Sequence, residues 1–169
     1  MLNIVICEDD NIQRSTIEKF IKNSIAKNDY SFRIKLSTAN PEDVLKNIGS
    51  GDIYFLDVDL NNKINGFKLA EKIRDIDSLG YIIFITTHSE LTYLTFKYRV
   101  EAMDFILKDN VNEIDFRINE CLSHIHKHIN KEKSDVKTLT LTLDDRIIKI
   151  LLKDIVFIET STNSHKIII

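Results

Sequence analysis

The sequence predicts an α/β protein: a doubly wound, five-stranded parallel sheet, followed by a smaller β-rich fragment. Five short apolar runs alternate with helical segments up to about residue 129. This alternation is typical of a parallel sheet with helices on both faces. Because crossovers between parallel strands are right-handed, the pattern favours a doubly wound sheet. In such a sheet the functional crevice lies beyond the carboxyl ends of the strands, so the residues that follow the strands are the candidate site.

Each expected strand is a short apolar run bounded by polar residues. The runs cover residues 3–7, 32–37, 53–56, 81–85 and 103–107. The second run alternates apolar and polar side chains, which is the period of a strand. The others are nearly continuous and indicate strands that are buried on both faces.

Helices are expected between the strands, where apolar residues recur every three or four positions. Their expected positions are about 11–27, from Pro41 to near Gly49, from Phe67 past Ile73, after Ser89, and about 111–130. Asn40 and Ser89 are expected to cap the second and fourth helices, and Pro41 suits a first helical position. We interpret Asp10 as the cap of the first helix rather than as a ligand.

The pattern changes after residue 129. Residues 130–136 form a charged segment that we interpret as a linker, and the period then changes from that of a helix to that of a strand. The strand candidates are 138–143, 147–152 and 155–158, with a turn at Asp144-Asp145. We therefore expect a separate β-rich fragment over residues 137–169.

Composition and charge limit the possible functions. Hydrophobic residues make up 43% of the 169, charged residues 29%, and the net charge is −3, which is typical of a globular protein without a general affinity for nucleic acid or membranes. No apolar run approaches the about 20 residues that span a bilayer, and the N-terminus lacks a signal-peptide pattern. We expect a cytoplasmic protein whose two cysteines, Cys7 and Cys121, are reduced and buried.

Charged and hydroxyl side chains follow four of the expected strands. Glu8 and Asp9 follow the first strand, Asp57 the third, Thr86 the fourth and Lys108 the fifth. Carboxylates in one crevice repel one another unless a divalent cation lies among them, and hard oxygen ligands suit Mg²⁺. An aspartate can attack phosphorus, while a hydroxyl and an ammonium can hold the phosphoryl oxygens. The set predicts phosphorylation of Asp57 with the help of Mg²⁺.

The motifs that carry these residues resemble the response-regulator receivers of two-component signalling. They are Cys7-Glu8-Asp9-Asp10, Phe55-Leu56-Asp57, Ile85-Thr86 and Phe105-Ile106-Leu107-Lys108, within residues 1–129. The resemblance implies a flavodoxin-like fold with strand order 2-1-3-4-5 and a sensor histidine kinase that phosphorylates Asp57. It also implies that Asp9 binds Mg²⁺ directly, Glu8 through water, and Asp59 through its backbone carbonyl.

The resemblance further implies a switch. Thr86 would move toward the phosphoryl group, Phe105 would change rotamer, and Lys108 would pair with a phosphoryl oxygen. Self-association is expected through the face formed by the fourth and fifth helices. The chain would catalyse its own phosphorylation and dephosphorylation without being a conventional enzyme. Receivers usually have proline after this lysine, with a cis peptide bond between the two. Here Asp109 follows Lys108, so whether the bond between them is cis stays an open question.

Residues 137–169 resemble the first strands of a LytTR DNA-binding domain, the output module of quorum-sensing response regulators. The segment Ser161-Thr162-Asn163-Ser164-His165-Lys166 is similar to the first DNA-contacting segment of that family, and His165 would contact bases. The rest of the module has no counterpart in these residues. We therefore expect DNA binding and transcription control only from a complete LytTR domain.

Two other functions stay open. Asp57-Val58-Asp59 also fits a Mg²⁺-dependent phosphohydrolase, with a nucleophile and a general acid two residues apart. In those enzymes the motif follows the first strand, and that reading leaves Glu8 and Asp9 unexplained. The other alternative is a pseudo-receiver, a binding module that is never phosphorylated, and the complete acidic set argues against it.

Overall fold

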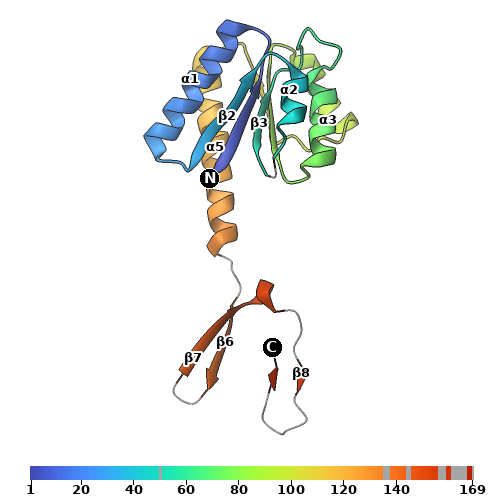
Figure 1. Ribbon diagram of the computed structural model, residues 1–169. Helices are drawn as coiled ribbons and strands as arrows, with labels where there is room; N and C mark the ends of the chain where they lie inside the picture. The colour runs from blue at the N-terminus through green and yellow to red at the C-terminus, as the bar shows by residue number, and fades with distance from the viewer. Residues whose placement is uncertain (50, 135–137, 144–145, 156–158, 161–166, 169) are drawn as a thin grey trace. The chain divides into compact units, whose positions relative to one another are not determined.

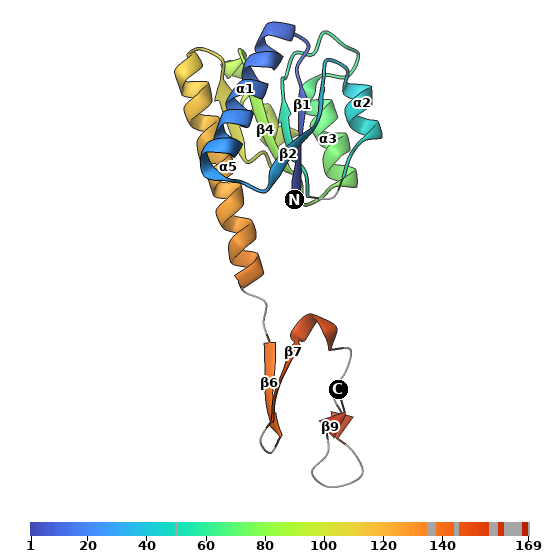
Figure 2. The same ribbon diagram turned by 60° about the vertical axis from the view of Figure 1, so that its left-hand side comes forward.

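The computed structural model describes residues 1–49, 51–134, 138–143, 146–155, 159–160 and 167–168. The chain divides into two compact units, Met1–His126 and Lys127–Ile169. Figure 1 shows the elements of both units, and Figure 2 turns the same view.

The first unit is a five-stranded parallel sheet with helices on both faces (Figures 1 and 2). Its strands are β1 (Leu2–Cys7), β2 (Phe32–Thr38), β3 (Ile53–Leu56), β4 (Tyr81–Thr86) and β5 (Asp104–Leu107). All neighbours are parallel, in the order β2-β1-β3-β4-β5. The predicted fold class and strand order are confirmed, and all five carboxyl ends lie at one edge.

The helices of this unit mostly begin at side chains that satisfy free backbone N–H groups. They are α1 (Asn11–Asn28), α2 (Pro41–Lys46), α3 (Gly66–Ile76), α4 (Leu94–Lys97) and α5 (Val111–Ser134). The Asp10 carboxylate accepts hydrogen bonds from the backbone at the start of α1, at 2.8 and 2.9 Å. Asn40 accepts one at the start of α2, before Pro41. The predicted caps Asp10 and Asn40 are confirmed.

The fourth helix differs from the prediction. A 3₁₀ turn, η1 (Ser89–Leu91), precedes an α4 of only four residues. Ser89 lies inside this turn and does not cap a helix, so that prediction was wrong. The hydroxyls of Thr92 and Thr95 donate to the backbone carbonyls three residues earlier, at 2.7 and 2.8 Å, and such bonds compete with regular helix. After α4, Arg99 and Glu101 adopt left-handed backbone with φ of 52° and 48°.

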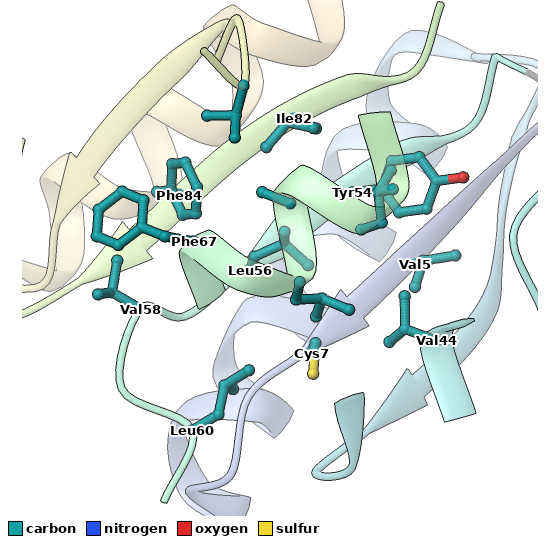
Figure 3. Close-up of a cluster of buried hydrophobic side chains, with 14 residues drawn as sticks. Val5, Cys7, Val44, Tyr54, Leu56, Val58, Leu60, Phe67, Ile82 and Phe84 are labelled. Atoms are coloured by element: carbon teal, nitrogen blue, oxygen red, sulfur yellow. The ribbon is translucent and has the colours of Figure 1, made fainter. Parts of the chain in front are cut away.

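A buried apolar cluster joins the sheet to α2 and α3 (Figure 3). Its members are Val5, Cys7, Val44, Tyr54, Leu56, Val58, Leu60, Phe67, Leu69, Ala70, Ile73, Ile82, Phe84 and Val100. Each large side chain buried here stabilises the fold by about 1.5–3 kcal/mol. Cys7 and Cys121 are both buried and free, as predicted. Because the cluster takes side chains from β1, β3 and β4, it fixes the ends of the strands that carry the candidate site.

A separate polar network lies at the amino-terminal edge of the sheet. The buried carboxylate of Asp77 accepts hydrogen bonds from Gly51 N at 2.8 Å, Asp52 N at 3.2 Å and the Tyr54 hydroxyl at 3.1 Å. Arg74 donates to five backbone carbonyls in the turns before β4 and β5. These bonds satisfy buried polar groups where the chain enters β3, β4 and β5.

The second unit contains short antiparallel pairs. Its elements are β6 (Thr138–Leu143), β7 (Arg146–Leu151), η2 (Leu152–Asp154), β8 (Glu159–Thr160) and β9 (Ile167–Ile168). β6 pairs with β7, and β8 with β9. Residues 130–134 of the expected linker are helical, because α5 continues to Ser134. The expected turn at 144–145, the segment 156–158 and His165 lie outside the described residues.

None of the helices in the described segments has both the length and the apolar character needed to cross a membrane.

Candidate functional site

Three carboxylates meet at the carboxyl edge of the sheet. Glu8, Asp9 and Asp57 each place a carboxylate oxygen within 4.8 Å of the others. β1 and β3 are neighbours with Cys7 opposite Leu56, and Asp57 N donates to Cys7 O at 2.9 Å. This register brings together the acids that follow each strand. Glu8 and Asp57 are only 1% and 7% exposed, while Asp9 is half-buried.

Lys108 joins the cluster from the end of β5. Its Nζ lies 2.6 Å from Glu8 Oε2 and 2.8 Å from Asp57 Oδ2, and its side chain is 7% exposed. Its backbone N–H donates to Thr86 O at 2.9 Å, which holds it beside the end of β4. A single ammonium cannot balance three neighbouring carboxylates, so the site favours a further cation.

Burial dominates the electrostatics of this edge. It raises the pKa of Glu8 to about 7; the hydrogen bond from Lys108 acts in the opposite direction, and the charge of Asp57 adds to the rise. Burial also raises the pKa of the Cys7 thiol to about 12, with smaller contributions from the Glu8 and Asp57 carboxylates. Negative charge is therefore costly here, which favours a ligand that carries positive charge.

The remaining predicted residues occupy different positions around the cluster. Thr86 is buried at the end of β4, and its Oγ1 accepts a hydrogen bond from His88 N at 3.3 Å. Phe105 lies on β5, with its ring centroid 5.8 Å from that of Phe84. The carboxylate of Asp59 is 65% exposed and lies 3.9 Å from His88 Nε2. The described residues contain no cis peptide bond, so Asp109 follows Lys108 in trans.

The structure adds three residues that sequence reasoning did not assign to the site. Asn61 Nδ2 donates to Asp9 Oδ2 at 2.7 Å. Arg14 donates to the backbone carbonyls of Glu8 and Asp9, at 2.6 and 3.4 Å. His88 pairs with Glu90 at 2.9 Å, and this hydrogen bond raises the pKa of the His88 imidazole.

Gly66 allows α3 to begin directly against the backbone of Asp57. A Cβ atom at Gly66 would lie 2.0 Å from the carbonyl oxygen of Asp57 and 2.8 Å from Val58 Cα. Gly66 N also donates to Val58 O at 2.9 Å. Since both close neighbours are backbone atoms, a side chain at this position would displace the segment that carries Asp57.

This fold and this site define a protein of the receiver class. The chain matches the response regulator receiver domain over residues 4–119, and it belongs to that family. It is 44% identical to accessory gene regulator protein A of Staphylococcus aureus over 172 aligned residues, which cover 99% of this chain and 72% of that protein. The corresponding protein of Staphylococcus epidermidis is 42% identical over the same coverage.

Solved structures support the same fold. The response regulatory domain of mrkE from Klebsiella pneumoniae aligns with a TM-score of 0.61 and 25% identity, over 75% of this chain and 99% of that chain. The response regulator TrrA from Thermotoga maritima, solved in complex with Mg²⁺-BeF, aligns with a TM-score of 0.56 and 22% identity. The alignment covers 71% of this chain and 98% of that chain.

Family membership sets the general function. The chain is the receiver part of a response regulator of a two-component system, similar to accessory gene regulator protein A. Its partner class is the histidine kinase, and receivers bind Mg²⁺ at an acidic pocket of the kind that Glu8, Asp9 and Asp57 form here.

Proposed function

We propose that Asp57 accepts a phosphoryl group from a sensor histidine kinase, assisted by Mg²⁺ that Glu8, Asp9, Asp57 and the backbone carbonyl of Asp59 hold. The observation that supports this proposal is the convergence of three carboxylates within 4.8 Å of one another, with one buried ammonium 2.8 Å from Asp57. An aspartate beside a fixed cation is suited to receive a charged group, because the phosphoryl oxygens find positive charge already in place.

The donor set fits Mg²⁺. Carboxylate and carbonyl oxygens are the hard ligands that this cation prefers, and it commonly keeps several waters. Glu8 is buried and bonded to Lys108, which suits contact with the cation through water. Asp9 is half-buried and suits direct contact. When bound, the cation would neutralise charge on the phosphoryl oxygens.

The transfer exchanges one bond for another. A carboxylate oxygen of Asp57 forms a bond to phosphorus, and the bond from phosphorus to the donor's imidazole nitrogen breaks. The electron pair stays on that nitrogen, which takes a proton from water. Lys108 then pairs with a phosphoryl oxygen and the Thr86 hydroxyl with another. Hydrolysis later returns Asp57 to a carboxylate, and we propose that the chain catalyses both steps on itself.

The new charge biases a conformational equilibrium toward self-association. In this proposal Thr86 moves toward the phosphoryl group and Phe105 changes rotamer. The partner is a second copy, bound through α4 and α5. Tyr93, which precedes α4, and Phe116 on α5 are 63% and 61% exposed, and such side chains are enriched in protein interfaces.

The output of the regulator is transcription control. We assign residues 1–129 to the receiver, 130–136 to a linker and 137–169 to the start of a LytTR domain. The likeness to accessory gene regulator protein A supports a quorum-sensing system, with DNA bound only by a complete LytTR domain and His165 among its contacts. Two free, buried cysteines are in keeping with a cytoplasmic location.

The phosphohydrolase alternative fits the geometry less well. It needs Asp59 as a general acid near the nucleophile, but the Asp59 carboxylate is 65% exposed and has His88 beside it. The ammonium that contacts Asp57 belongs to Lys108 instead. The pseudo-receiver alternative does not explain why the complete acidic set is assembled.

A phosphorylation assay tests the proposal. The purified chain, incubated with Mg²⁺ and acetyl phosphate, should gain the mass of one acid-labile phosphoryl group. Asp57→Asn should abolish the gain, and Asp59→Asn should retain it. Labelling that persists in Asp57→Asn would refute the assignment. Repeated turnover of a phosphomonoester that is lost in Asp59→Asn would favour the hydrolase.

A further inference from the structure

Arg14 forms hydrogen bonds with the turn between β1 and α1, which carries two residues of the acidic cluster. Its Nη1 donates to the carbonyl oxygen of Glu8 at 2.6 Å and to that of Asp9 at 3.4 Å, and its Nη2 donates to the side chain of Asn11. These bonds reach the backbone of the two acidic residues, which leaves their carboxylates available to the site. One guanidinium therefore ties together the residues that supply two of the three acids.

The position of Arg14 on α1 is unfavourable for a cation by itself. It lies near the start of α1, where the helix dipole places partial positive charge. The first turn itself contains no acidic residue, and the carboxylate of the cap residue Asp10 is bonded to the backbone N–H groups of Ile12 and Gln13 rather than to Arg14. Its contacts with carbonyl oxygens account for a positive charge at this position. A planar guanidinium can bond several acceptors at once, which the single ammonium of lysine does less well.

Glu8 and Asp9 depend on the hydrogen bonds from Arg14 to different degrees. Glu8 is also held by Lys108 at 2.6 Å and through its own N–H, which donates to Thr38 O at 3.1 Å. Asp9 is half-buried, and its carboxylate is bonded to Asn61 at 2.7 Å. Loosening the turn would therefore displace Asp9 more than Glu8.

We propose that Arg14 is a positioning residue of the Mg²⁺ site: it holds the turn so that the carboxylates of Glu8 and Asp9 face Asp57. The proposal rests on the proposed function, because Mg²⁺ is the ligand in question. Charge and positioning predict opposite effects. The guanidinium of Arg14 is a nearby cation that repels Mg²⁺, so loss of the Arg14 charge alone would tighten Mg²⁺ binding. Loss of positioning weakens it.

Titration of the full 169-residue chain with Mg²⁺ by calorimetry separates the two roles. Arg14→Gln should weaken Mg²⁺ affinity by roughly tenfold, as is common for residues that orient metal ligands, and Arg14→Lys should restore part of the loss. Arg33→Gln is the matched control. Arg33 is an exposed arginine that donates to Asn3 at 2.8 Å on strands β2 and β1, and its loss should leave Mg²⁺ affinity unchanged.

A second measurement needs no metal. Amide hydrogen exchange at Asp9 and Asp10 should be faster in Arg14→Gln than in wild type, while exchange in β3 stays slow. Equal or tighter Mg²⁺ binding by Arg14→Gln, unchanged exchange in the turn, or an equal loss of affinity in Arg33→Gln would each overturn the assignment of Arg14. Absence of Mg²⁺ binding by wild type would instead overturn the proposed function, and the role of Arg14 with it.

Discussion

Lys108 and Asp57 form an ion pair of 2.8 Å although 51 positions separate them in the chain. The pair forms because β3 and β5 run parallel on either side of β4 and end at the same edge. Both side chains are less than a tenth exposed, so little solvent screens the attraction. The positive charge that a phosphoryl group requires is therefore fixed in position beforehand.

Replacing Lys108 by alanine should slow phosphorylation of Asp57 by about 100-fold, because a fixed group that stabilises developing charge is lost. Mg²⁺ should bind at least as tightly as to wild type, since a competing cation is gone. Mass spectrometry with acetyl phosphate measures the rate, and calorimetry the affinity. Lys19→Ala, on an exposed position of α1, is the control. An unchanged phosphorylation rate in Lys108→Ala would exclude this role.

Gly66→Ala should destabilise the fold by about 1–3 kcal/mol, as is typical of overpacking, and should also slow phosphorylation. Its Cβ would lie 2.0 Å from the Asp57 carbonyl oxygen. Gly80→Ala is the matched comparison, because its Cβ would meet Asp77 Oδ2 at 2.7 Å and the Tyr54 ring at 2.8 Å, at the other edge. Urea unfolding should show a lower free energy of unfolding in both variants. Phosphorylation should be slower only in Gly66→Ala. Normal phosphorylation of Gly66→Ala would contradict the prediction.

Ile12→Asp should impair transfer from a histidine kinase and leave transfer from acetyl phosphate unchanged. A cavity of about 270 Å³ lies beside Lys108, with Ile12 and Val111 among its lining residues. These two side chains are 79% and 60% exposed, so a protein donor that reaches Asp57 across this side would bury them. Comparing the two donors separates docking from chemistry. Equal loss with both donors would show that the substitution damages the site itself.

Asp77→Ala should lower the free energy of unfolding by about 3 kcal/mol, because buried donors lose a charged acceptor. The donors are Gly51 N, Asp52 N and the Tyr54 hydroxyl. Asp75→Ala, at an exposed position two residues earlier, should change stability by about 0.5 kcal/mol or less. Urea denaturation measures both. At urea concentrations below its unfolding transition, Asp77→Ala should still be phosphorylated. Equal free energies of unfolding for the two variants would contradict the prediction.

The strands and most helices were predictable because their signals are local. Buried parallel strands give short apolar runs, and Asn40-Pro41 is a strong start signal for a helix. The fourth helix was not predictable in the same way, because Ser89 resembles a cap while the threonine hydroxyls that follow bond to the backbone and interrupt the helix. The predicted end of α5 was too early, since the two lysines and the glutamate of 131–134 are good helix formers and no glycine or proline ends the helix there.

The site was predictable as far as strand order determines it. Residues that follow parallel strands must meet at one edge, and Glu8, Asp57 and Lys108 do so. The contacts of Arg14 and Asn61 were not predictable, because they depend on how a turn directs backbone carbonyls and on how far a side chain reaches. A basic residue near the start of α1 was the only signal of the first, and an asparagine in the loop after Asp57 the only signal of the second.

The sheet keeps its two polar networks at opposite edges, with Asp77 at the amino ends of the strands and Lys108 at the carboxyl ends. A random mutagenesis screen should therefore sort inactive clones into two groups. Clones with substitutions near Asp77 should lack the protein on an immunoblot. Clones with substitutions near Lys108 should accumulate normal amounts of a regulator that is inactive in signalling. This separation means that a substitution at one end of the strands can affect signalling without affecting the stability of the scaffold at the other end.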